Sequence, residues 1–106
     1  MSRSMKVRSR PHEGGEVELV VLVNHPMENG LRIDKQTGQK IPAHFIQEIA
    51  VAHNGRVVAT VATGGGVSQD PLLGFRIPGT RPGDTLTVSW RDNRGESDSV
   101  ETTVSP

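Results

Sequence analysis

The apolar residues of this 106-residue chain mostly follow a two-residue repeat, which is the period of a β-strand. Residues 16–25 begin with alternating charged and apolar positions and then become apolar at every position from Leu19 to Val23. We therefore expect a strand that is half-exposed at its start and buried on both faces at its end. Residues 43–52 carry apolar side chains on both parities, which predicts a second, central strand.

Turn residues divide the remaining sequence into further short strands. Asn54-Gly55 separates residues 43–52 from the apolar run 56–62, and this dipeptide predicts a hairpin because both of its residues tolerate a positive φ. Later strands are expected around Leu73, Phe75 and Ile77, around Leu86, Val88 and Trp90, and around Val100, Thr102 and Val104. Residues 92–95 should close the hairpin between the last two.

These elements indicate an all-β protein. No segment has a helical period, and the 13 valines outnumber the 6 leucines, which favours strands over helices. We expect an antiparallel immunoglobulin-like or fibronectin-III-like β-sandwich of about seven strands. The length predicts one domain over residues 1–106, in which residues 1–10 form a frayed arm or an edge strand with solvated charges.

Composition excludes several classes of chemistry. The chain has no cysteine, which removes disulfides, thiolate metal sites and a cysteine nucleophile. Its 12 basic and 12 acidic residues leave no net charge, so a dedicated nucleic-acid binder is not expected. The basic start lacks an apolar run behind it, so we expect neither a signal peptide nor a membrane anchor in this sequence.

The four histidines do not show the close spacing of a local metal site, so we expect no metal. There is no nucleophile elbow for a Ser-His-Asp triad, and Gly64-Gly65-Gly66 lacks the following Lys-Ser/Thr of a phosphate loop, so we expect no catalytic residue and no cofactor. Assembly of distant residues stays open. The corresponding alternative is a small hydrolytic or metal-dependent enzyme that uses His25, His44 and Asp34.

The segment from Pro26 to Pro42 has no strand periodicity and is long for a connection within a compact domain. Its apolar residues indicate that it is ordered and docked on something, since a disordered linker seldom keeps so many. A solvated loop with local ion pairs is one interpretation. The other is a protein interface, in which Met27 and Leu31 fill pockets and Arg32 makes a directed, multi-donor contact.

The same segment carries a resemblance to a known family. The runs HPMENGLRID (25–34) and IPAHFI (41–46), and later VSQDP (67–71) and VSWRDNRGES (88–97), are similar to the SoxZ family in order and spacing. SoxZ is the smaller subunit of the SoxYZ sulfur carrier of bacterial thiosulfate oxidation. The resemblance covers about residues 16–100 and departs from the family pattern at Asp70 and Leu72.

The resemblance implies an immunoglobulin-like fold and a non-catalytic role. The expected partner is a SoxY-like chain, whose C-terminal cysteine carries the sulfur intermediates, and other Sox enzymes would make transient contacts. Export to the periplasm would be led by the partner's signal peptide. The candidate partner-binding residues are Met27, Leu31, Arg32, Ile33 and Phe45 as contacts, with His25, Glu28 and Asp34 as orienting groups. An adhesion or ligand-binding sandwich module is the alternative.

Overall fold

The computed structural model describes residues 4–105, which form seven β-strands. Within this range there is no helix of the length and apolarity needed to cross a membrane. The strands are β1 (Met5–His12), β2 (Glu16–Val23), β3 (Ile46–His53), β4 (Arg56–Ala62), β5 (Leu72–Ile77), β6 (Thr85–Asp92) and β7 (Ser97–Thr103).

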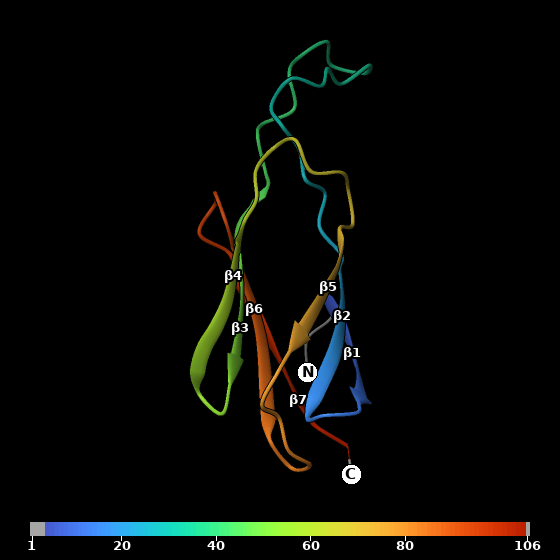
Figure 1. Cartoon of the computed structure of the whole chain (residues 1–106). Coiled ribbons are helices and arrows are strands. Elements are labelled where there is room, and N and C mark those ends of the chain that lie inside the picture. The colour runs from blue at the N-terminus through green and yellow to red at the C-terminus, as the bar shows by residue number, and fades with distance from the viewer. Residues whose placement is uncertain (1–3, 106) are drawn as a thin grey trace.

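The strands pair into two antiparallel sheets, which confirms the predicted β-sandwich. One sheet has the order β1-β2-β5 and the other has the order β4-β3-β6-β7, and Figure 1 shows them facing each other. β1 is an edge strand along β2, so residues 5–10 form the expected edge strand and are not frayed. Pro11 and His12 extend this pairing, opposite Val17 and Glu16 of β2. Residues 1–3 of the predicted arm lie outside the described residues.

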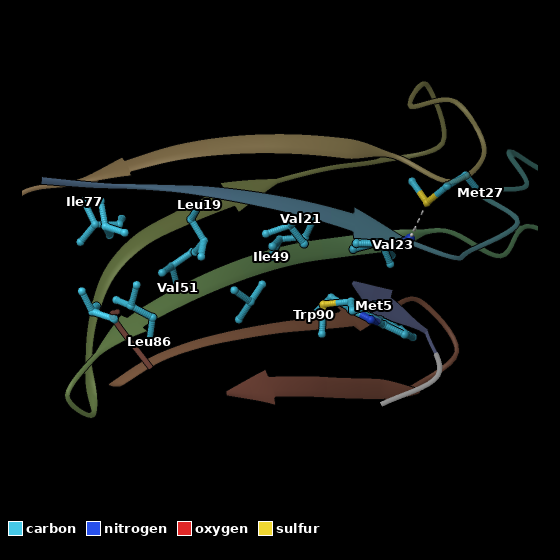
Figure 2. Close-up of a cluster of buried hydrophobic side chains, with 14 residues drawn as sticks. Met5, Leu19, Val21, Val23, Met27, Ile49, Val51, Ile77, Leu86 and Trp90 are labelled. Carbon is cyan, nitrogen blue, oxygen red and sulfur yellow. Dashed lines mark hydrogen bonds between the residues drawn. The ribbon is translucent and has the colours of Figure 1, made fainter. Parts of the chain in front are cut away.

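Alternate residues of facing strands fill the space between the sheets. β2 contributes Val17, Leu19, Val21 and Val23, all fully buried. Figure 2 shows Leu19, Val21 and Val23 on the side of β2 that faces the opposite sheet. β3 is central, as predicted, and lies between β4 and β6. Its register shifts between Ile46 and Glu48, and this irregularity allows both Ile46 and Ile49 to be buried although they differ in parity. The opposing face is completed by Val51, Leu86, Val88 and Trp90.

The expectation that the end of β2 is buried on both faces is wrong. Val20 and Leu22 are 36% and 39% exposed, because no element covers the outer face of the three-stranded sheet within residues 4–105. Buried and exposed side chains therefore alternate to the end of β2 in the structure, although the sequence there is continuously apolar.

The Asn-Gly hairpin is confirmed. Asn54 and Gly55 have φ values of 49° and 85° and join β3 to β4. A non-glycine residue seldom adopts a positive φ, and asparagine tolerates it better than most. The turn at residues 92–95 likewise joins β6 to β7, with Gly95 at φ 80°.

Candidate functional site

Residues 26–44 form an arm that projects from one end of the sandwich, beyond the ends of the strands (Figure 1). The arm leaves the sheet after β2 and returns at β3 in the other sheet. Two isolated bridges, Glu28 with His44 and Ile33 with Lys40, hold its outgoing and returning halves together. The molecule measures 54 Å along its longest axis and only 23 Å and 21 Å across. The prediction that this segment is ordered is confirmed by these pairings.

Asp34 shapes the turn at the tip of the arm. Its side-chain Oδ1 accepts a hydrogen bond from the Gln36 N–H at 2.8 Å, and its backbone carbonyl accepts one from the Gly38 N–H, also at 2.8 Å. Gly38 has a φ of 73°, a conformation that favours glycine. Asp34 is thus a turn-forming residue at the tip of the arm, beyond the Ile33–Lys40 bridge, and does not belong to its base at the Glu28–His44 bridge.

The arm presents two large apolar side chains to solvent. Leu31 is 70% exposed and Ile33 is 57% exposed, so neither residue is docked on another part of the described chain, and docking on a partner stays a prediction. Between them, Arg32 forms an ion pair with Glu28, in which Nη2 contacts Oε1 and Nε lies 3.0 Å from the same oxygen. The hydrogen bond from Arg32 lowers the pKa of Glu28, and Glu28 in turn raises the pKa of Arg32. The exposed apolar pair thus flanks an arginine that is paired with a glutamate of the same chain and remains largely exposed.

The base of the arm is fixed by three polar residues that come from distant parts of the sequence. His25 follows β2, His44 precedes β3, and Asp92 ends β6. The Nε2 atoms of His25 and His44 lie 3.1 Å and 2.8 Å from the same Asp92 oxygen, Oδ2. The two imidazole rings meet edge to face with their centroids 4.5 Å apart. His25 and the Asp92 carboxylate are almost fully buried, and His44 is partly buried.

The second oxygen of Asp92 is used as well. Oδ1 accepts hydrogen bonds from the backbone N–H groups of Arg94 at 3.0 Å and Glu96 at 2.9 Å. Burial is the largest single influence on Asp92 and raises its pKa, but the hydrogen bonds from His25, His44 and the two backbone groups together outweigh it. The net pKa of Asp92 is therefore lowered, and the residue is a buried carboxylate with four donors around it.

The hydrogen-bond partners also assign the protonation of His25. Its Nδ1 accepts a hydrogen bond from the Met27 N–H at 3.1 Å, so the proton of the neutral ring lies on Nε2 and is donated to Asp92. His25, His44 and Asp92 have the residue types of a metal site, and their candidate ligand atoms lie within 4.8 Å of one another. A metal on His25 Nε2 would require that nitrogen to give up its proton and Nδ1 to lose its backbone donor. The geometry fits a hydrogen-bonded clamp better than a metal centre.

Other predicted site residues belong to the base of the arm. Met27 is buried, adopts a φ of 51°, and its sulfur accepts a hydrogen bond from the Ile46 N–H at 3.4 Å. Phe45 is half-buried against the core, and its N–H donates to Asn93 Oδ1 at 2.8 Å. These two residues therefore anchor the arm from within the chain, whereas Leu31 and Ile33 point outward.

A cleft of about 500 Å³ lies between the outgoing half of the arm and the loop before β5. Glu28, Asn29 and Arg32 line one side, and residues 65–69 line the other. The two loops approach so closely that a Cβ on Gly65 would lie 3.0 Å from the Cβ of Asn29. Glycine at this position therefore permits the arm to rest against its neighbour.

Sequence reasoning missed the role of Asp92, which it treated only as part of a turn. The alternative of an enzyme did group His25 with His44, and the structure does bring these two residues together, but with Asp92 in place of Asp34. The only available signal was the placement of each residue at the end of a predicted strand. Which strand ends share one end of the sandwich depends on sheet topology, which the pattern does not supply.

Comparisons with known proteins agree with this architecture. The model of the family described as sulphur oxidation protein SoxZ matches residues 5–103. No curated protein matches the chain. Among solved structures, a superoxide reductase (neelaredoxin) from Archaeoglobus fulgidus in the reduced form is similar with a TM-score of 0.67 and 22% identity, over 96% of this chain and 89% of that one. A single-residue mutant of that reductase, also in the reduced form, is similar with a TM-score of 0.65 and 21% identity, over 97% of this chain and 89% of that one. At this identity the likeness concerns the fold alone.

Proposed function

Because this chain belongs to the SoxZ family of sulphur oxidation proteins, we propose that it is the non-catalytic subunit of a two-chain sulfur carrier. In this proposal it binds a SoxY-like chain, whose cysteine carries the covalent sulfur intermediates. The absence of cysteine from this chain supports that division of labour, because the sulfur must then be attached to a partner.

The observation that carries the proposal is the arm, which exposes two large apolar residues on a backbone held in place at its base. Leu31 and Ile33 are 70% and 57% exposed, whereas Met27 at the base of the arm is only 6% exposed. Burying a leucine or isoleucine side chain against a partner contributes about 1.5–3 kcal/mol. The clamp at Asp92 fixes where the arm leaves the sandwich, so less conformational entropy is lost when a partner binds.

The Glu28–Arg32 ion pair on the arm can orient the partner that binds Leu31 and Ile33. Glu28 is mostly buried by its neighbours, whereas the Arg32 guanidinium is largely exposed and keeps donors free for an acceptor on a partner. Leu31 and Ile33 would supply most of the binding free energy, and Arg32 would orient the partner. His25, Met27, Asp34 and Phe45 would then act from within the chain, by holding the shape of the arm.

The hydrogen-bonded state of the histidines supports the non-catalytic part of the proposal. His25 has both ring nitrogens occupied, and Asp92 has both oxygens occupied. A general base needs a free lone pair that a substrate proton can reach. His25 has no such free lone pair in this buried cluster. The cluster lies at the base of the arm, where it supports the arm.

We also propose that the complex meets the other Sox enzymes in the periplasm and that the chain is exported together with its signal-bearing partner. The support is the family resemblance. Cell fractionation tests this: the chain should reach the periplasm when the partner keeps its signal peptide and should stay in the cytoplasm when that signal is deleted. Periplasmic chain without the partner would contradict it.

The experiment for the arm is a pair of matched double variants. Leu31→Asp with Ile33→Asp places two charges on the arm, and Val57→Asp with Val58→Asp places two charges on exposed apolar residues of β4. We expect the arm variant to bind an immobilised SoxY-like chain at least 100-fold more weakly, with unchanged circular dichroism. The β4 variant should bind as the parent does. Equal affinity of the arm variant and the parent would overturn the assignment.

A further inference from the structure

The outer face of the three-stranded sheet carries an ordered array of side chains that the proposed function does not use. Cross-strand partners in β1, β2 and β5 form three rows: Lys6, Leu22 and Leu72, then Arg8, Val20 and Gly74, then Arg10, Glu18 and Arg76. Partners in register point to the same side of a sheet. These nine residues make up the basic-apolar face of the protein.

Its apolar part is continuous across two strands. Leu22 and Leu72 are direct partners and are 39% and 69% exposed, and Val20 beside them is 36% exposed. Gly74 lies opposite Val20, and a Cβ placed there would meet nothing within 4 Å. Single exposed apolar residues are ordinary, but a contiguous strip on a sheet face with polar neighbours is typical of an interaction site.

Its basic part is a row of three cations along β1. Lys6, Arg8 and Arg10 occupy successive outward positions, about 6.7 Å apart. None of the three forms an ion pair with a residue of the described range 4–105. Arg76, at the far side of the face, does pair with Glu16 at 2.7 Å. Glu18 is the cross-strand partner of Arg10 and lies 3.6 Å from Arg76, whereas the partners of Lys6 and Arg8 in β2 are the apolar Leu22 and Val20. The positive charge of the row is therefore least compensated at Lys6 and Arg8.

The face continues into a hollow at the end nearest the arm. An open pocket of about 310 Å³ lies beside Lys6 and Leu22 and is bounded by Asn24 and Asp70. The first row of the face therefore ends in a depression that an apolar side chain of a partner can enter. The face itself belongs to the side of the sandwich, whereas the arm extends from its end (Figure 1).

We propose that the basic-apolar face is a second docking surface, for a partner protein that places a row of acidic side chains beside a row of apolar ones. The acidic row pairs with Lys6, Arg8 and Arg10, and the apolar row covers Val20, Leu22 and Leu72. A helix with glutamates at positions i, i+4 and i+8 repeats its charges about every 6 Å, close to the spacing along β1. Leucines at i+3 and i+7 of the same helix lie next to that row.

A protein partner fits this face better than an anionic membrane surface. Insertion into a bilayer uses aromatic or long apolar side chains that reach past the basic ones. On this face the cations stand at one edge and the apolar residues are in a flat strip beside them, with no aromatic residue among the rows. A row of cations beside a flat apolar strip is complementary to a protein surface that has an acidic row beside an apolar one.

The test is a titration of the ¹⁵N-labelled full chain, followed by amide chemical shifts, with a synthetic helical peptide that carries the glutamates and leucines described above. We expect shifts in β1, β2 and β5, at least tenfold weaker binding at 0.5 M salt, and no binding of the same peptide with lysine in place of glutamate. Equal binding of both peptides, or shifts confined to the arm, would overturn the proposal.

Matched charge reversals complete the test. The triple variant K6E, R8E, R10E should bind the acidic peptide at least tenfold more weakly, whereas R56E, R81E, R94E, which changes net charge equally at exposed sites elsewhere, should bind as the parent does. If the first triple variant does not fold, Leu22→Ser with Leu72→Ser replaces it, with the same expected loss. Binding to vesicles of phosphatidylcholine and phosphatidylglycerol but not to the peptide would contradict a protein partner.

Discussion

His25 and Asp92 join the two sheets at the base of the arm: the Nε2–H of His25, just beyond β2, donates to Oδ2 of Asp92, the last residue of β6, over 3.1 Å. His44 reaches the same oxygen from the returning end of the arm. One buried carboxylate therefore fixes both ends of a projecting segment and the sheets that carry it. This arrangement links the stability of the sandwich to the position of the arm.

Replacement of Asp92 by asparagine should destabilise the protein and loosen the arm. An asparagine side chain can still accept from Arg94 and Glu96 at the Oδ1 position, but its NH₂ group would face two imidazole N–H donors. An unmatched buried polar group of this kind costs about 1–3 kcal/mol. Urea unfolding measures the loss, and hydrogen exchange should be faster in residues 26–44 than in the parent. Unchanged exchange in the arm would contradict the clamp.

The lowered pKa of Asp92 predicts a loss of stability in acid. Because the folded pKa lies below the ordinary value, the unfolded chain takes up the proton first as pH falls. The contribution of Asp92 is thus fully present above the unfolded pKa of about 4 and is lost as pH drops through the folded pKa. Urea midpoints between pH 2.5 and 5 should fall more steeply for the parent than for Asp92→Asn. Parallel slopes would show that Asp92 is not the group responsible.

Metal binding offers a sharp check on the protonation assigned to His25. We expect less than a tenth of an equivalent of zinc, iron, manganese or cobalt in protein purified with these metals and desalted, because His25 Nδ1 is held by Met27 and Nε2 carries the proton. Elemental analysis measures the content. One equivalent of metal that disappears in His44→Ala would contradict the assignment and turn the clamp into a metal site.

Trp90 contributes to the core next to the clamp. The indole is only 6% exposed, stacks edge to face on His25 with centroids 5.3 Å apart, and donates from Nε1 to Ser4 Oγ. Trp90→Ala should lower the free energy of unfolding by about 3–5 kcal/mol, because burial is lost and a cavity forms. Leu72→Ala, at a site 69% exposed, is the control and should change it by less than about 0.5 kcal/mol. A small effect at Trp90 would contradict its place in the core.

Local patterns predicted the strands because alternation and turn chemistry act over a few residues. The hairpin at Asn54-Gly55 and the buried parity of Leu86, Val88 and Trp90 follow from such short-range signals. The outer face of β2 could not be predicted in the same way. Val20 and Leu22 are apolar for either of two reasons, burial in the chain's own core or burial under a partner, and the sequence pattern is the same in both cases.

The candidate site was predictable only in part. The long segment at Pro26–Pro42 signalled an ordered and functional loop, and the arm is indeed held by its own bridges. The convergence of His25 and His44 on Asp92 depends on which strand ends share one end of the sandwich, a long-range property of topology. Likewise, Met27 and Leu31 have similar hydrophobicity, yet Met27 lies in the core and Leu31 in solvent, because only Met27 lies at the base of the arm, next to the sandwich.

We propose that this chain supports a sulfur carrier without carrying sulfur itself. Native mass spectrometry of the chain coexpressed with a SoxY-like partner, before and after incubation with thiosulfate and the purified conjugating enzyme, tests it most directly. We predict a heteromer whose added mass lies entirely on the partner. An isolated 11.4 kDa chain, or added mass on this chain, would contradict the account.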